Sequence, residues 1–133
     1  MAQQTKKLNV MERQRQSAVV ADMMLTIVAA MQRDYRRKHI GASFEELLVA
    51  MAVRRNDNQG KPPINVAALE KVLNVPRSNV SRAVATLIRH QGIIRKVDHA
   101  YTGNPAYLAP RVDAAYFTAI REAIITAAHE LQK

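Results

Sequence analysis

The stretch Leu69–Val97, LEKVLNVPRSNVSRAVATLIRHQGIIRKV, constrains the fold most, because its apolar residues recur at three- and four-residue steps. That spacing predicts two short amphipathic helices that share one apolar face. Asn74 tolerates the left-handed backbone of a tight turn between them, and Pro76 presets φ for a new helix. The two helices should therefore cross at a steep angle. The residues of the predicted apolar face are Val72, Leu73, Val75, Val80, Val84, Leu87 and Ile88.

The second of these helices, residues 77–90, turns a face without acidic residues away from the apolar side. In a DNA major groove, arginine can bond guanine bidentately and asparagine can bond adenine. The face therefore predicts contact with double-stranded DNA. A merely solvated face is the alternative, although solvated faces usually mix both charge signs. The candidate base-contacting residues are Arg77, Ser78, Asn79, Ser81 and Arg82.

A stop signal and two strand-like segments follow this helix. Gly92 can end the helix in a left-handed cap, and IIRKV is a short strand of apolar and basic residues. His99–Pro105 has turn composition, and a second strand is expected around Ala106–Leu108. Helix, turn, helix and hairpin together predict a winged helix-turn-helix over residues 44–110. The candidate contacts to the DNA backbone are Thr86, Arg89, Arg95, Lys96 and, in the wing, His99, Tyr101 and Thr102.

These residues resemble the winged helix-turn-helix of MarR-type transcriptional regulators, a resemblance that covers about a quarter of the chain. Ser81-Arg82 in the second helix and the Gly92-Ile-Ile ending carry it. The chain departs from the family pattern at Glu70, where Ala is usual, and at Pro76, which replaces a capping Ser. The wing also lacks the family's acidic-x-Arg motif, so no minor-groove arginine is assigned. The resemblance implies a DNA-binding regulator and allows a small-molecule effector near a dimer interface.

Apolar-rich segments flank this region on both sides. Residues 8–38 contain no Gly or Pro and carry a helical apolar stripe, which predicts one long helix, broken at most once early on. Residues 113–132 predict a helix with Asp113 as N-cap and apolar residues on more than one face. A helix of about thirty residues spans roughly 45 Å, more than a small domain can cover. We therefore expect a homodimer through 8–38 and 113–132, with a monomer of packed terminal helices as the alternative.

The segments between these regions contain capping and loop signals. Ser43 is a candidate N-cap for a helix over 44–55, in capping-box spacing with the glutamate three residues later. The sequence NDNQGKPP at 56–63 has loop composition. The next helix is expected to follow the N-cap Asn65, and Ile64 could add a small third strand to the wing.

The composition is that of one globular domain over 1–133, mainly α with a small β-hairpin. The chain has 133 residues, 48% of them hydrophobic, and a formal charge of +9, so nucleic acid or another polyanion is the natural partner. It contains no cysteine, which excludes disulfides and thiolate metal sites, and its four histidines lack metal-ligand spacing. The apolar run at 18–31 is too short and too interrupted for a membrane span, so a soluble cytoplasmic protein is expected.

Catalytic motifs are not found in the sequence. It has no Gly-rich phosphate loop, nucleophile elbow or zinc-protease motif, so we expect neither an enzyme nor a cofactor. Met23, Met24 and Met31 could line an effector pocket, although core packing is the favoured interpretation.

Two hypotheses about function follow. The first is a homodimeric, sequence-specific transcriptional regulator, with repression as the favoured mode. The alternative is a winged-helix interaction module or a general DNA-binding protein in replication or partition. The operator, the regulated genes and any effector ligand stay open.

Overall fold

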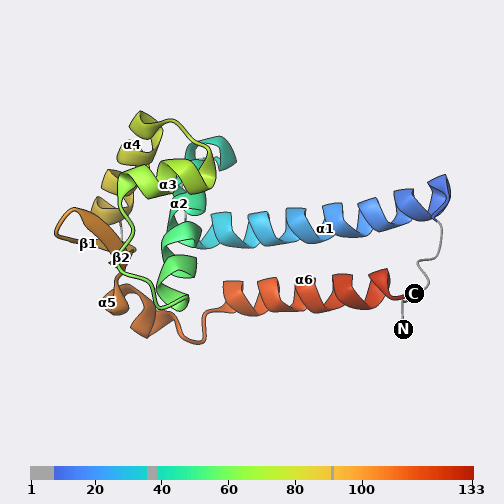
Figure 1. Cartoon of the computed structure of the whole chain (residues 1–133). Coiled ribbons are helices and arrows are strands. Elements are labelled where there is room, and N and C mark those ends of the chain that lie inside the picture. Colours follow the sequence, from blue (N-terminus) through green and yellow to red (C-terminus); the bar gives the residue numbers. More distant parts are fainter. Residues whose placement is uncertain (1–7, 36–38, 91) are drawn as a thin grey trace. The chain divides into compact units, whose positions relative to one another are not determined.

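The computed structural model describes residues 8–35, 39–90 and 92–133, which are mainly helical with one small antiparallel sheet. The chain divides into two compact units. The terminal helices form one, and residues between 36 and 113 form the other (Figure 1). This division follows the three segments predicted from the sequence, whereas a single domain over 1–133 stays a prediction.

The first unit consists of α1 (Val10–Tyr35) and α6 (Ala115–Leu131), which lie side by side (Figure 1). Asn9 caps α1, because its side-chain oxygen accepts a hydrogen bond from the backbone N–H of Glu12 at 2.8 Å. Without Gly or Pro, α1 runs unbroken to its end. It confirms a long helix within 8–38, of which residues 36–38 lie outside the described residues.

The predicted N-cap of the last helix is wrong. α6 begins after Ala114, whose backbone is extended and which offers no side-chain cap, rather than after Asp113. A capping oxygen must stand at the N-cap position to reach the second or third helical N–H. Asp113 lies one residue too early and is exposed.

Arg15 ties the two terminal helices together. Its Nη1 donates to the backbone carbonyl oxygen of Glu130 at 2.8 Å, and its Nη2 pairs with Glu12 at 2.7 Å. The hydrogen bond with Glu12 raises the pKa of Arg15, and the hydrogen bond from Lys133 lowers the pKa of Glu130. Such exposed pairs contribute little stability. They do show that the first turns of α1 meet the last turn of α6, so the helices are antiparallel.

The second unit is built around α2 (Ile40–Asn58), which packs against α3 (Val66–Leu73), α4 (Arg77–Arg89) and one strand of a hairpin. The predicted apolar face is confirmed for α4 at its centre. It is wrong for Val72 and Ile88, which are 48% and 37% exposed. The core residues, each less than a tenth exposed, include Val49, Val53, Ile64, Leu69, Val80, Val84, Leu87, Ile93 and Ile94.

α2 is longer at both ends than the helix predicted over 44–55. Ser43 is not its N-cap, because Ser43 lies inside the helix and its Oγ donates to the carbonyl oxygen of His39 at 3.1 Å. Because α2 begins at Ile40, the backbone N–H groups after Ser43 already have partners within the helix and need no cap. At the other end the helix includes Asp57, so the loop is shorter than NDNQGKPP. The side chain of Asp57 bonds to the hairpin, a tertiary contact that outweighs the loop composition.

The turn between α3 and α4 has the predicted structure. Asn74 adopts the left-handed conformation, with φ 53° and ψ 46°. Pro76 occupies the N-cap position of α4 with φ −54° and forms no side-chain cap. At the start of α3, Asn65 is confirmed as the N-cap, since its side-chain oxygen accepts from the N–H of Ala68 at 2.8 Å. Local sequence therefore sets both ends of this helix pair.

The hairpin is tighter than the sequence predicted. Strands β1 (Ile94–Val97) and β2 (Ala100–Gly103) pair antiparallel, with Asp98 in the left-handed region at φ 56°. Aspartate tolerates this conformation, so the chain can reverse between Val97 and Ala100. The second strand expected around Ala106–Leu108 is therefore wrong.

Helix α5 (Pro105–Leu108) occupies the place of that expected strand, and a short 3₁₀ turn, η1 (Ala109–Arg111), follows it. Asn104 caps α5 by accepting from the N–H of Ala106 at 3.1 Å. Pro105 presets φ for the first helical position. Asn-Pro is thus a helix start here rather than the turn that we expected.

Two further backbone features attach the hairpin to the helices. Ile64 pairs with Tyr101 through N–H···O bonds of 3.0 and 2.8 Å, which form a single β-bridge rather than the third strand that we expected. Gly92 has φ 62° and confirms the left-handed conformation, two residues after the C-cap His90 of α4. A Cβ at Gly92 would lie 3.3 Å from Nδ2 of Asn104, so this close approach also favours glycine.

Candidate nucleic-acid interface

The outward side of α4 carries the residues that we predicted to contact bases. Val80, Val84 and Leu87 are buried, so the helix is held by one face and presents the other to solvent. The helix contains no acidic residue. Of the five candidates, Asn79 is half-buried and the others are exposed: Arg77, Ser78, Ser81 and Arg82.

A series of side-chain hydrogen bonds crosses from α2 to this face. Asn79 Nδ2 donates to Glu45 Oε2 at 2.9 Å. The amide oxygen of Asn79 accepts from Arg82 Nη2 at 3.0 Å and from Ser78 Oγ at 3.3 Å. Three of the five candidates are therefore joined to one another. Asn79 uses both ends of its amide within the protein. Arg77 and Ser81 differ, because their exposed side chains form no hydrogen bond to any other described residue.

Sequence reasoning missed Glu45 as part of this site. The helix predicted over 44–55 puts Glu45 in its first turn, but α2 begins five residues earlier, at Ile40. Glu45 therefore lies in the second turn, where its carboxylate reaches α4. No local pattern could have indicated this contact, because it joins residues 34 positions apart.

The other α4 candidates lie toward its end. Thr86 is half-buried, and Arg89 is exposed. The Nε of Arg89 donates to the carbonyl oxygen of Ala85 at 3.4 Å. A cation near the C-terminus of a helix is favoured by the helix dipole, so this position serves the helix as well as an anionic ligand.

The hairpin adds two exposed basic residues, Arg95 and Lys96, on β1. In the register of the sheet, Arg95 stands opposite Thr102 and Lys96 opposite Tyr101. Within the described parts of the chain, these two side chains and the three arginines of α4 form no ion pair with a carboxylate. Their charge is therefore available to an external anion.

The remaining candidates in the hairpin differ in solvent exposure and in hydrogen bonding. His99 is exposed at the hairpin turn, whereas Tyr101 and Thr102 are half-buried. The hydroxyl of Thr102 donates to Asp57 Oδ1 at 2.8 Å, and the N–H of Gly103 donates to Asp57 Oδ2 at 2.8 Å. Thr102 thus anchors the hairpin to α2. Asp57 is a second residue that sequence reasoning missed, since its partners are 45 and 46 positions away.

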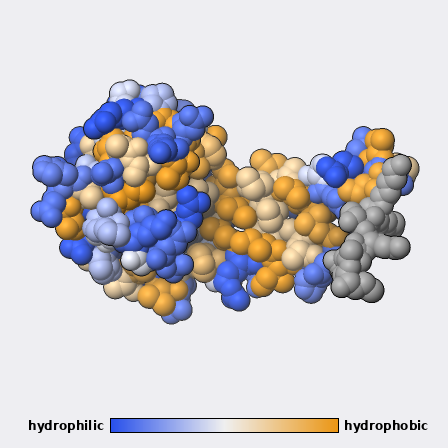
Figure 2. All heavy atoms as spheres, viewed as in Figure 1, coloured by the Kyte–Doolittle hydropathy of each residue, from blue (hydrophilic) through white to orange (hydrophobic). Residues whose placement is uncertain are grey.

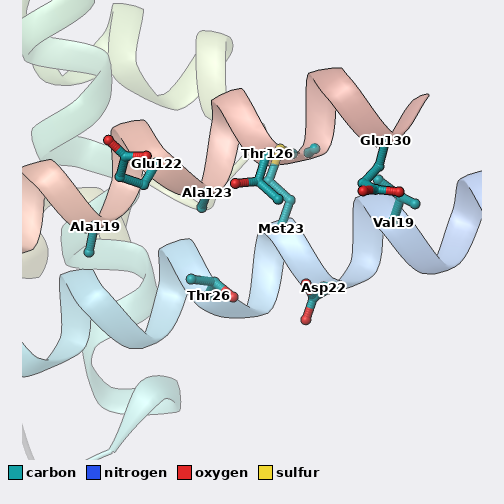
Figure 3. A pocket seen from close by; sticks show the side chains of 10 residues that line it. Val19, Asp22, Met23, Thr26, Ala119, Glu122, Ala123, Thr126 and Glu130 are labelled. Carbon is teal, nitrogen blue, oxygen red and sulfur yellow. The ribbon is translucent and has the colours of Figure 1, made fainter. Parts of the chain in front are cut away.

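The candidate effector residues belong to the first unit. Met23 lines a groove between α1 and α6 and reaches toward Thr126, with Val19 beside Glu130 nearer the helix ends (Figure 3). Met31 is half-buried and Met24 is 53% exposed. Core packing is therefore the wrong interpretation for Met24.

In residues 8–35, 39–90 and 92–133, no three His, Asp or Glu side chains come together in a group that could hold a metal ion. None of the helices in that part of the chain has the length and apolar character needed to cross a membrane.

Comparison of the chain with protein-family models, curated proteins and solved structures found no match. The resemblance to MarR-type regulators therefore rests on residues 69–97 alone.

Proposed function

We propose that this protein is a sequence-specific, double-stranded DNA-binding transcriptional regulator in which α2 to α4 and the hairpin form a winged helix-turn-helix. One observation carries the proposal. The solvent face of α4 presents arginines and serines without a carboxylate of its own, on a helix whose other face is buried. A single helix of this kind fits the major groove of DNA. There the guanidinium of arginine can form two hydrogen bonds to guanine, and serine hydroxyls can hydrogen-bond to the edges of several bases.

The candidate residues divide into two groups by their position. Arg77, Ser81 and Arg82 belong to the first half of α4, which in helix-turn-helix proteins enters the groove and reads bases. Arg95 and Lys96 lie on the hairpin, where exposed cations would bind phosphates and fix the orientation of the protein. This division supports sequence-specific binding over a purely electrostatic contact.

A homodimer formed through α1 and α6 completes the proposal. Apolar side chains are exposed over both helices (Figure 2), and a helix pair cannot bury them within itself. A second copy of the chain would cover them and supply a second α4 for a symmetric site. A dimer on a promoter would repress by occlusion. The most exposed of these side chains are Val10, Met11, Met24, Leu25, Phe117, Ile124 and Ile125.

The test is selection from a random pool of DNA duplexes at moderate salt, followed by sequencing of the retained molecules. We expect an enriched palindrome whose half-sites lie about one helical turn, or a multiple of it, apart. Binding without an enriched motif would contradict sequence-specific regulation and favour a general DNA-binding protein. An absence of binding would favour a protein interaction module.

A matched pair of variants sharpens this test. The double variant R77A/R82A removes two positive charges from α4, and R54A/R55A removes two from exposed positions on α2. We expect the first to abolish enrichment of the motif and the second to retain it. An equal loss for both would show that charge alone determines retention.

A further inference from the structure

The orientation of the Asn79 amide is determined by the chemistry of its two neighbours. A carboxylate without a proton can only accept, so the atom of Asn79 facing Glu45 must be its nitrogen. A guanidinium can only donate, so the atom facing Arg82 must be the amide oxygen. The two bonds require the same orientation, and each therefore reinforces the other.

The orientation of the Asn79 amide matters mainly because it restricts the side chain of Arg82. An exposed arginine loses side-chain entropy when it is fixed on a ligand, and a partner that holds it beforehand reduces that cost. Asn79 binds Nη2 of Arg82 and occupies one of the five N–H donors of the guanidinium. Four donors remain, enough for a bidentate bond to the O6 and N7 atoms of a guanine.

We propose that Glu45 and Asn79 form a positioning relay that holds Arg82 toward one guanine of the DNA site. This inference rests on the proposed function and deepens it. Asn79 is then a positioning residue rather than a base-contacting one. Glu45, on α2 and outside the recognition helix, determines specificity through Asn79. Its carboxylate also lowers affinity for any DNA, because it places negative charge near the phosphates.

The relay predicts different results for two variants of Glu45. Glu45→Ala removes the acceptor, so Asn79 and Arg82 lose their fixed orientation. We expect the ratio of affinities for the selected site and a random duplex to fall about three- to tenfold, the loss typical of one hydrogen bond. Glu45→Gln keeps an acceptor oxygen without the charge. It should keep this ratio within about twofold while raising affinity for both duplexes.

A double-mutant cycle distinguishes the relay from a general structural role. If Glu45 acts through Arg82, then Glu45→Ala should not lower the specificity ratio further in a protein that already carries Arg82→Ala. Asn79→Ala should behave as Glu45→Ala does. Glu70→Ala, which removes a half-buried carboxylate of α3, is the matched control and should keep the native ratio.

The outcomes separate failure of the relay from failure of the proposed function. If the native protein enriches no motif, the proposed function fails and the relay fails with it. If the native protein enriches a motif but Glu45→Ala retains the native ratio, only the relay is overturned. An equal fall in the ratio with and without Arg82 would also overturn it. Circular dichroism and thermal unfolding of each variant identify changes caused by misfolding.

Discussion

At the scale of single residues, Arg82 and Lys96 carry the same charge in different settings. Arg82 belongs to a helix whose other face is buried, and its guanidinium donates a hydrogen bond to Asn79. Lys96 is exposed on β1 and is a compact point charge. A planar guanidinium held in one orientation can distinguish one base from another, whereas the flexible ammonium group of lysine binds any phosphate. The two residues should therefore affect DNA binding in different ways.

Arg82→Ala is expected to cost about 1–3 kcal/mol on the selected site and to relax the preference at one base position. Lys96→Ala should weaken all sequences alike and lower the slope of log affinity against log salt by about one. Dissociation constants measured for specific and random duplexes over a range of salt check both results. An equal loss for Arg82→Ala on the two duplexes would contradict a base-reading role.

Gly92→Ala tests the left-handed residue that follows α4. The positive φ costs a residue with a Cβ about 1–2 kcal/mol, and the added atom would also crowd Asn104. Gly60 is a matched control, since its φ is +70° and nothing lies within 4 Å of a Cβ there. Chemical denaturation should show a larger loss of unfolding free energy for Gly92→Ala. If Gly60→Ala lost as much unfolding free energy as Gly92→Ala, backbone strain alone would account for the loss at Gly92.

At the scale of secondary-structure elements, α2 is the support for both parts of the candidate interface. Its second turn bonds α4 through Glu45, and its last turn bonds the hairpin through Asp57. The helix therefore fixes α4 and the hairpin relative to each other at two separate points. An interface that must match a groove and its phosphates together requires this kind of support.

Asp57→Ala should loosen the hairpin without unfolding the helices. It leaves the Thr102 hydroxyl and the Gly103 N–H without their acceptor, at a cost of about 1–2 kcal/mol. Hydrogen exchange at the Gly103 amide should become faster, while amides in α4 keep their protection. Asn58→Ala, at the neighbouring exposed residue, is the control and should leave both unchanged. Unchanged exchange at Gly103 in Asp57→Ala would argue against anchoring by Asp57.

At the scale of the whole molecule, the chain combines a unit with a well-formed core and a unit with almost none. The second unit buries residues from each of its helices, whereas α1 and α6 bury only Ala30, Tyr35 and Ala127. Two helices with so small a core are marginal alone. Association with a second copy is the simplest means of stabilising them, which is why the proposed function includes a dimer.

Leu25→Glu tests that association. Leu25 is 71% exposed on α1, so a charge there costs the monomer little but would be buried unpaired in a dimer. We expect sedimentation analysis to show a shift from dimer to monomer, with weaker binding to a palindromic duplex. Gln59→Glu adds the same charge at an exposed position just after α2, outside the two terminal helices, and should leave the native state of association. A native protein that sediments as a monomer would contradict the proposed dimer.

Local physical chemistry was enough to predict much of the middle of the chain. The Asn74 turn, the Asn65 cap and the buried side of α4 follow from backbone preference and helical period, so they could be determined from neighbouring residues alone. The tight hairpin, the start of α5 and the true ends of α2 were predicted wrongly. The end of α2 depends on bonds between Asp57 and the distant hairpin, whereas the start of α5 follows from the local cap by Asn104, a signal that we misinterpreted.

For the candidate site too, some features were predictable from the sequence and others depended on the tertiary structure. The sequence by itself determined that α4 presents arginines and serines opposite an apolar face, because a helix converts residue spacing directly into direction. Only the tertiary structure decided that Asn79 is bonded to Glu45 and Thr102 to Asp57. These bonds form between elements that the sequence separates by 34 and 45 residues, and side-chain hydrogen bonds act only over about 3 Å. Folding had to bring those atoms together before any of these residues could take its role.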